Sequence, residues 1–127
     1  MNNEELKKKL EQLKIEDSIW TIYIGIIILS WYSNDLERKY YLYHDLESKK
    51  KYREILIFIF SILVIVYYYF FYSSLTDIKN LKESDSEKKK KLVYLSAFGS
   101  LLIFISGIIF LYIAILDEDL TVEVAFN

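Results

Sequence analysis

Apolar residues in this chain gather into three long runs that are separated by blocks of charged and polar residues. The longest run covers 92–116, which is 25 residues without a charged side chain, Pro, Asn or Gln. A helix of that length reaches roughly 37 Å, enough to cross a bilayer core of ~30 Å with some tilt. A helix of this length in a soluble protein would show a polar face, and this run shows only Ser, Gly and Tyr. The run therefore predicts a transmembrane helix.

The two other apolar runs, 55–72 and 18–33, predict two further spans. The run 55–72 ends in six consecutive aromatic residues, which are typical of the aromatic belt at a membrane interface. The run 18–33 has only 16 residues, so its helix of ~24 Å crosses if the bilayer thins locally or if Trp20 and Trp31 mark the interfaces. A buried or re-entrant segment is the alternative for this first run.

The segment 1–17 before the first run predicts a short amphipathic helix. Leu6, Leu10 and Leu13 fall at i, i+4 and i+7 and so form one apolar stripe. Such a helix lies on a membrane surface or pairs with a partner. An ordinary solvated lead-in to the first span is the alternative.

The segment 34–54 predicts a second helix or loop at the membrane interface. Asn34 followed by Glu37 has the N-cap and N3 pattern of a helix start. A face of tyrosines opposite a charged face suits the headgroup level. The lysine-rich stretch 48–51 is the expected turn before the second span.

The segment 73–91 predicts a basic loop, and 117–127 an acidic, extended tail. Ser84 and Glu87 give the S-x-x-E pattern of a capping box, which predicts the start of the third helix. Apolar and polar residues alternate with a period of two in the tail, as in a strand. We therefore expect an all-α integral membrane protein over residues 1–127, a three-helix transmembrane bundle with a short N-terminal amphipathic helix and an extended C-terminal tail.

Composition agrees with a small polytopic membrane protein. The 127 residues are 54% hydrophobic and 27% charged, and the two classes lie in separate blocks. The formal net charge of -2 gives no bulk attraction to nucleic acid. The absence of cysteine excludes disulfides and thiolate metal sites.

The distribution of Lys and Arg predicts an orientation for a chain with three spans. The N-terminal segment and the second loop share one side and carry ten basic residues, against six in the first loop and none in the tail. The positive-inside rule then places the N-terminus in the cytoplasm and the C-terminus outside the plasma membrane.

The apolar runs lack the residues that most membrane enzymes and transporters use. They contain no Asp, Glu, Lys, Arg or His, whereas proton-coupled transporters, pumps and voltage sensors place ionisable groups inside the bilayer. Their serines have no catalytic partner within the runs. His44 lies among acids on a charged segment, and the acidic tail is better explained by solvation than by Ca²⁺ binding. We expect no enzyme activity, cofactor or metal.

Small residues on two of the runs are the candidate contact sites. In lipid, small residues let helix backbones approach closely and associate. They stand at Ser96, Gly99, Ser100, Ser106 and Gly107 in the third run, and at Thr21 and Gly25 in the first. This face could pack within one chain, between copies of the chain, or against another membrane protein.

Four lysines before the third run are the candidate contacts to anionic lipid headgroups. They are Lys88, Lys89, Lys90 and Lys91. Lysines near such a surface gain about 1 kcal/mol each.

These observations favour a non-enzymatic accessory or regulatory membrane protein. Such a protein would bind another membrane protein through the third helix, or through a tail that adds a strand to a partner's sheet. A homo-oligomeric channel lined by the Ser/Gly/Tyr face is the alternative. A lipid-acting interfacial enzyme ranks last because no catalytic set is visible.

Overall fold

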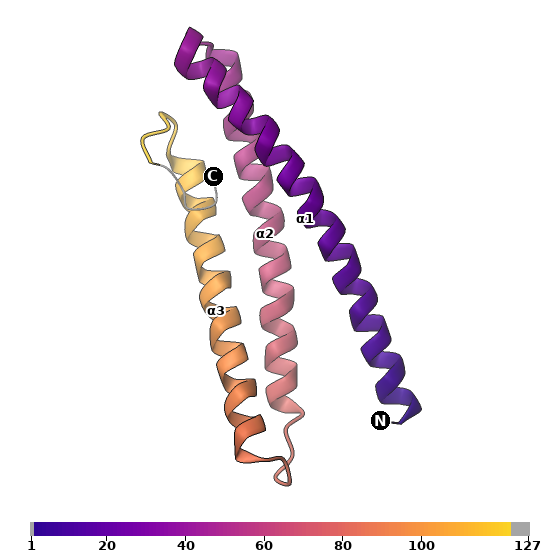
Figure 1. Ribbon diagram of the computed structural model, residues 1–127. Helices are drawn as coiled ribbons and strands as arrows, with labels where there is room; N and C mark the ends of the chain where they lie inside the picture. Colours follow the sequence, from indigo (N-terminus) through magenta and orange to yellow (C-terminus); the bar gives the residue numbers. More distant parts are fainter. Residues whose placement is uncertain (1, 123–127) are drawn as a thin grey trace. The chain divides into compact units, whose positions relative to one another are not determined.

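A computed structural model describes residues 2–122, which form three helices and no strand within that range (Figure 1). The helices are α1 (Asn3–Tyr43), α2 (Leu46–Lys79) and α3 (Glu87–Leu116). The chain divides into two compact units, one up to Tyr52 and one from Arg53 onward. The division falls within α2, close to its start. The expected all-helical fold is confirmed.

Helix α1 is one continuous helix of 41 residues with a clear cap at each end. At its start, the Asn2 side chain accepts a hydrogen bond of 2.8 Å from the backbone N–H of Glu5, which satisfies one of the free donors of the first turn. At its end, His44 adopts a left-handed conformation with φ 53° and donates its backbone N–H to the Tyr40 carbonyl at 2.8 Å. The helix therefore ends at Tyr43.

The helix that the sequence predicted to begin at Asn34 does not begin there, because α1 passes through that position unbroken. Asp35 lies 3.2 Å from Arg38 and 3.6 Å from Lys39, and ion pairs at i,i+3 and i,i+4 support a helix interior. The amphipathic segment 1–17, the apolar run 18–33 and the segment that follows it belong to the same helix. The expectation of a separate short N-terminal helix was therefore wrong.

Helix α2 starts earlier and ends later than the apolar run 55–72. The turn expected at 48–51 lies instead at His44 and Asp45. The Asp45 carboxylate accepts hydrogen bonds from the Ser48 hydroxyl at 2.7 Å and the Glu47 N–H at 3.2 Å. The Ser48 hydrogen bond is the main cause of the lowered pKa of Asp45. A carboxylate at this position stabilises the positive end of the helix dipole.

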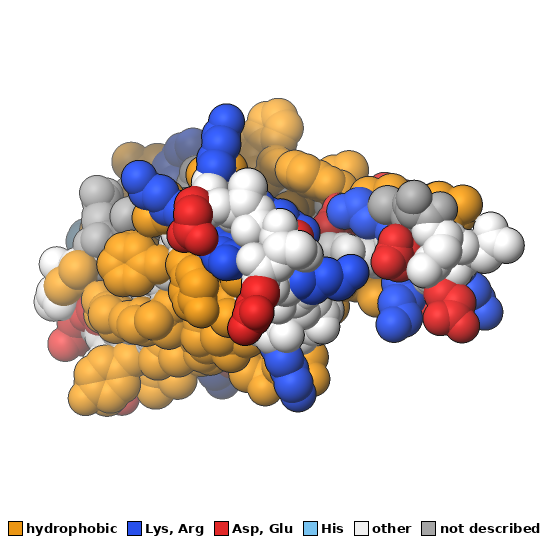
Figure 2. Space-filling view, turned by 90° about the horizontal axis from the view of Figure 1, so that it is seen from below, with side chains coloured by type: hydrophobic (Ala, Val, Ile, Leu, Met, Phe, Trp, Pro, Cys, Tyr) orange, Lys and Arg blue, Asp and Glu red, His pale blue; other side chains and the backbone are white. Residues whose placement is uncertain are grey.

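The loop between α2 and α3 is shorter than the segment 73–91 suggested, because helix occupies both of its ends. Only residues 80–86 lie outside the helices. The N-cap of α3 is Ser86, whose hydroxyl accepts the Lys89 N–H at 3.1 Å. The capping box at Ser84 and Glu87 was therefore placed two residues too early. Figure 2 looks onto this end, where Lys, Asp and Glu side chains surround the loop.

After α3, the described part of the tail turns instead of extending. Asp117 accepts hydrogen bonds from the backbone N–H groups of Thr121 and Val122, both at 2.9 Å. Leu120 has φ 54°, a left-handed conformation that a strand does not contain. The extended tail expected over 117–127 is thus wrong for 117–122, and 123–127 lie outside the described residues.

Within the second unit, the part of α2 from Arg53 onward runs antiparallel to α3, side by side with it (Figure 1). Aromatic rings join them along their length, with centroids 5.8 Å apart for Phe60 and Phe110 and 5.7 Å apart for Tyr68 and Phe104. The ring of Phe71 also stacks on Phe104 at 6.0 Å. We call this pair the α2–α3 hairpin.

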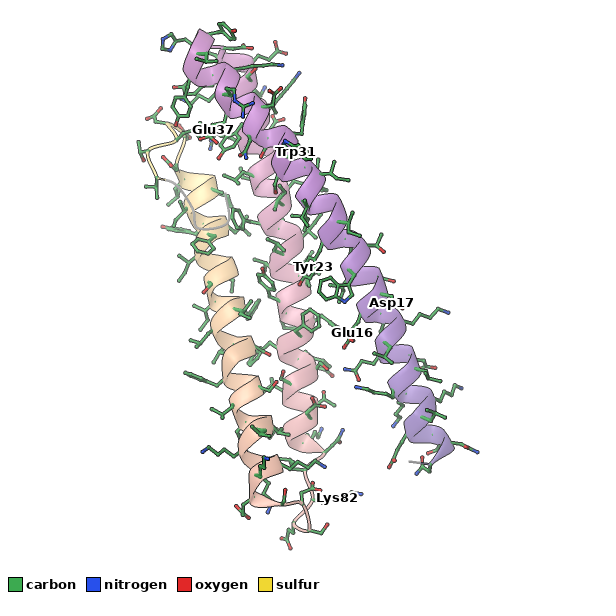
Figure 3. All side chains as sticks on the ribbon, viewed as in Figure 1. Glu16, Asp17, Tyr23, Trp31, Glu37 and Lys82 are labelled. Atoms are coloured by element: carbon green, nitrogen blue, oxygen red, sulfur yellow. The ribbon has the colours of Figure 1, made fainter. Side chains whose placement is uncertain are left out.

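Two of the three helices, α2 and α3, are long and apolar enough by length and composition to cross a membrane. Helix α1 is not among them. Only 17 residues separate Asp17 from Asp35, and they include Trp, Tyr, Ser and Thr side chains. Figure 3 shows Glu16 and Asp17 before this stretch, Tyr23 and Trp31 within it and Glu37 after it. Two of the three expected spans therefore lie in helices whose length and composition would allow them to cross a membrane.

Candidate helix-packing surface and charged ends

The closest approach of α2 and α3 lies at Gly107. A Cβ at this position would lie 2.9 Å from Cδ2 of Tyr67 and 3.4 Å from Cγ2 of Val64. Glycine is therefore the residue that lets the ring of Tyr67 rest on the α3 backbone. Close approach at a small residue is the contact that drives helix association in lipid.

A pair of serine hydroxyls forms a polar contact within the hairpin. The hydroxyl oxygens of Ser74 and Ser100 are 3.0 Å apart, and Ser74 also donates to the Phe70 carbonyl at 3.0 Å. Because a hydroxyl has one hydrogen to donate, Ser100 is the donor to Ser74. The buried Ser74 is thereby satisfied as both donor and acceptor.

The α3 positions at this interface repeat with heptad spacing. Ala97, Gly107 and Ala114 are its buried residues, and Ser100 and Phe104 contact α2. The spacings of three and four residues are those of helices that cross at about 20° with interlocking side chains.

The small residues that the sequence predicted on one face of α3 fall into two sets in the structure, one that faces α2 and one that does not. Ser100 and Gly107 face α2. Gly99 has nothing within 4 Å of the position that its Cβ would take. Ser96 and Ser106 are exposed, and Ser106 donates to the carbonyl of Leu102 at 2.9 Å. The sequence could not divide them because both sets share spacings of three and four residues.

A shallow groove of about 260 Å³ runs between the two helices at Ser106 and Gly107. Phe60, Leu63 and Tyr67 line it from α2, and Ile103, Ser106 and Phe110 line it from α3. Its walls are mostly apolar, with one hydroxyl from each helix. The groove therefore suits an apolar side chain or helix more than a charged ligand.

The small residues expected on the first run, Thr21 and Gly25, lie on α1. The Thr21 hydroxyl donates to the Asp17 carbonyl at 3.1 Å, and no atom lies within 4 Å of a Cβ built at Gly25.

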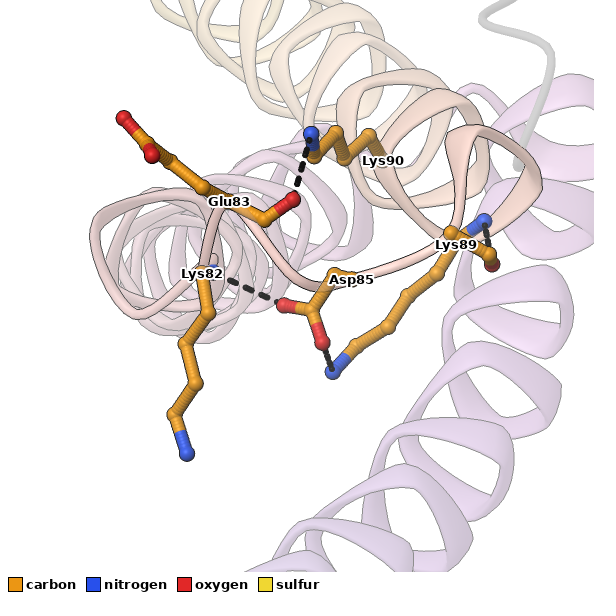
Figure 4. Close-up of polar contacts among 6 residues, drawn as sticks. Lys82, Glu83, Asp85, Lys89 and Lys90 are labelled. Carbon is orange, nitrogen blue, oxygen red and sulfur yellow. Dashed lines mark hydrogen bonds and ion pairs between the residues drawn. The ribbon is translucent and has the colours of Figure 1, made fainter.

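The loop end of the α2–α3 hairpin is held by Asp85 (Figure 4). Its carboxylate accepts the Lys82 N–H at 2.8 Å and lies 3.0 Å from the ammonium of Lys89. The Lys82 hydrogen bond, followed by that of Lys89, lowers the pKa of Asp85. The ammonium of Lys90 donates to the Glu83 carbonyl and to Glu87, both at 3.4 Å.

The four candidate headgroup lysines therefore fall into two pairs. Lys89 and Lys90 are tied to the loop and the first turn of α3. Lys88 and Lys91 form no ion pair within residues 2–122 and are exposed. Within the described residues, only this second pair keeps its charge without an ion-pair partner.

The opposite end of the hairpin is joined by Arg53, which sequence reasoning did not single out. Its guanidinium donates to the Ile115 carbonyl at 3.2 Å, across 62 residues of chain. A cation at the last carbonyls of a helix satisfies a free acceptor and stabilises the negative end of the dipole. The sequence feature that could have indicated this role is the position of Arg53, a cation just before the apolar run 55–72. Next to it, hydrogen bonds from Thr121 lower the pKa of Asp117.

The described residues form no cluster of three or more His, Asp or Glu side chains that could hold a metal ion. His44, the one histidine of the chain, serves as the C-cap of α1. No protein-family model matches the sequence, and no curated protein or solved structure is significantly similar to it.

Proposed function

We propose that this chain is a small integral membrane protein that acts without catalysis, as an accessory or regulatory subunit of another membrane protein. Its α2–α3 hairpin crosses the bilayer, and the side of the hairpin that carries the groove binds a transmembrane helix of the partner. The observation that carries the proposal is the apolar surface that the hairpin leaves open.

That surface is largest on α3. In this 30-residue helix the buried residues are Ala97, Gly107 and Ala114, while none of its large apolar side chains is buried and most are exposed. Exposed apolar surface on this scale marks a membrane or a protein partner. The exposed side chains include Leu95, Phe98, Leu102, Ile103, Ile105, Ile109 and Tyr112.

The partner contact is supported by the groove and by the open small residues next to it. Gly99 has free space where a side chain would stand, and Ser106 lines the groove one heptad further along. Small residues at this spacing let a second helix approach closely. Ser106 and Ser61 already donate to carbonyls of their own helices, at 2.9 and 2.7 Å. These hydroxyls therefore do not need water molecules as hydrogen-bond acceptors. This favours a partner helix over a water-filled pore at this surface.

The membrane we propose is the plasma membrane, with the N-terminus in the cytoplasm. If residues 18–33 also cross, the C-terminus lies outside; if only the hairpin crosses, both termini share one side. For the hairpin alone the positive-inside rule does not predict an orientation, because each end of the hairpin has six basic residues near it. They are Arg38, Lys39, Lys49, Lys50, Lys51 and Arg53 at one end, and Lys79, Lys82, Lys88, Lys89, Lys90 and Lys91 at the other.

Site-specific photocrosslinking in native membranes tests the proposal. A photoreactive amino acid at Ile103, inside the groove, should give one discrete crosslink to a different membrane protein. The same amino acid at Ile105, which is exposed and absent from the groove lining, is the matched control and should give none. Ser106→Leu should remove the crosslink from Ile103 because its larger side chain fills the groove.

Two results would overturn the accessory role. Crosslinks from Ile103 only to copies of the same chain, together with conductance of the purified protein in planar bilayers, would establish the channel alternative. Crosslinks to lipid alone from both positions would leave the groove without a protein partner.

A further inference from the structure

A second groove, of about 390 Å³, lies at the loop end of the α2–α3 hairpin. Asp77 lines it from α2, and Lys88, Lys89, Leu92, Val93 and Ser96 line it from α3. All of these residues belong to the second compact unit, so the groove is a feature of the hairpin itself.

One carboxylate and two ammonium groups line this groove, and only one of the three is already in an ion pair. Lys89 is 3.0 Å from Asp85 and therefore already paired. Asp77 and Lys88 are exposed, and within the described residues neither forms an ion pair or a side-chain hydrogen bond, including with the other. The groove therefore offers one unpaired anion from α2 and one unpaired cation from α3.

The groove changes from charged to apolar along the axis of α3. Lys88 and Leu92 are four residues apart, so they lie on the same face in successive turns. Leu92 and Val93 begin the apolar run that continues to Leu116. If the hairpin spans the bilayer as proposed above, the charged part lies at the headgroup level and the apolar part beside the acyl chains.

We propose that this groove binds a glycerophospholipid with a primary ammonium in its headgroup, of the phosphatidylethanolamine class. The lipid phosphate faces Lys88, the ammonium faces Asp77, and an acyl chain follows Leu92 and Val93. An anionic lipid without a cation would satisfy Lys88 and leave Asp77 facing negative charge. The groove thus selects a zwitterionic headgroup, and a primary ammonium, unlike a quaternary one, can also donate a hydrogen bond to the Asp77 carboxylate. Lys91, outside the groove, supplies only general attraction to anionic lipid.

Native mass spectrometry of the full-length, delipidated protein tests this selection. The probe is an equimolar mixture of phosphatidylethanolamine, phosphatidylglycerol and phosphatidylcholine with identical acyl chains. The wild-type protein should retain phosphatidylethanolamine over phosphatidylglycerol by about threefold, the effect of one exposed ion pair. Asp77→Asn should bring that ratio close to one, and Lys88→Gln should lower retention of all three lipids.

Two variants next to the groove serve as matched controls. Glu83→Gln removes an exposed carboxylate from the loop and Lys91→Gln removes an exposed ammonium from the same lysine run, and neither residue lines the groove. Both should keep the wild-type ratio. All four substitutions are at exposed residues, and unchanged far-UV circular dichroism checks that the helices are intact.

Flotation with phosphatidylethanolamine-containing vesicles separates the two proposals. A wild-type protein that does not float overturns membrane insertion and this inference with it. A protein that floats but binds phosphatidylglycerol as well as phosphatidylethanolamine overturns this inference alone. A ratio that Asp77→Asn leaves unchanged does the same.

Discussion

Two glycines of α3, Gly99 and Gly107, have opposite surroundings. At Gly107 an added Cβ would press on the ring of Tyr67, while at Gly99 it would meet nothing within 4 Å. Glycine is thus required for helix packing at position 107, whereas position 99 has room for a larger side chain. This difference allows a matched test of the α2–α3 contact.

Gly107→Ala should destabilise the α2–α3 hairpin by about 1–3 kcal/mol, because the Tyr67 ring must move to admit the methyl group. Gly99→Ala, the control, should be neutral or stabilising by up to about 1 kcal/mol, since alanine favours a helix interior over glycine. Titration of the purified protein with a denaturing detergent, followed by circular dichroism, measures both effects. Equal stability of the two variants would show that the helices do not meet at Gly107.

The carboxylate of Asp85 should titrate below its ordinary pKa of 3.8, because the Lys82 N–H and the Lys89 ammonium stabilise its charged form. Since the folded pKa is the lower one, the carboxylate stabilises the loop above the unfolded-state pKa. That stabilisation is lost as the pH falls through the folded value. Carbon NMR of the side-chain carboxyl gives the pKa directly.

Two lysine variants test which ammonium group lowers the pKa of Asp85. Lys89→Gln should raise the pKa of Asp85 toward its ordinary value, while Lys90→Gln should leave it unchanged because Lys90 contacts Glu87 and the Glu83 carbonyl instead. An Asp85 that titrates at its ordinary value in the wild-type protein would contradict the loop geometry.

At the scale of whole elements, α1 is the clearest departure from what the sequence pattern indicates. The polar–apolar–polar sequence over 1–54 predicts three segments, yet a single helix runs from Asn3 to Tyr43. The polarity of a side chain determines whether it contacts lipid or water. The continuity of a helix depends instead on whether each residue allows helical backbone angles and hydrogen bonds. The chain contains no proline, and Gly25 is the one glycine within α1, so nothing forces a break.

Asp35→Pro distinguishes the continuous helix from a new helix that starts at Asn34. Proline is favoured at the first position of a helix, but inside a helix it removes a hydrogen bond and costs about 3 kcal/mol or more. The structure predicts a clear loss of helicity by circular dichroism. Asp35→Ala, which removes the ion pairs with Arg38 and Lys39 and adds no proline, should lose little. Full helicity in Asp35→Pro would favour the break.

Some of the helices and their contacts could be predicted from the sequence, and others could not. The apolar runs 55–72 and 92–116 lie inside α2 and α3 because long uncharged stretches leave few alternatives to helix. The N-cap of α3 could not be predicted, since Ser84 and Ser86 are equally good acceptors and only the backbone path selects Ser86. The contact of Arg53 with Ile115 joins residues 62 positions apart, which no local pattern encodes.

At the scale of the molecule, the α2–α3 hairpin has a length and charge distribution suited to a bilayer. With 34 and 30 residues, the helices measure roughly 51 and 45 Å, longer than the ~30 Å hydrocarbon core. In a hairpin that spans the bilayer as proposed, the charged ends would reach the headgroup regions on both sides. Asp85 and the lysines would stand at one surface, and Arg53 and Asp117 at the other.

The most direct test of this account is the sidedness of the two ends of the hairpin. Because the chain has no cysteine, Glu83→Cys and Glu118→Cys each introduce one exposed thiol, in the loop and just after α3 respectively. Sealed vesicles of one orientation are treated with a membrane-impermeant maleimide before and after detergent is added. A hairpin that crosses the bilayer leaves one of the two cysteines protected until the detergent is added. Equal labelling of both cysteines in intact vesicles would place the two ends on the same side and contradict a transmembrane hairpin.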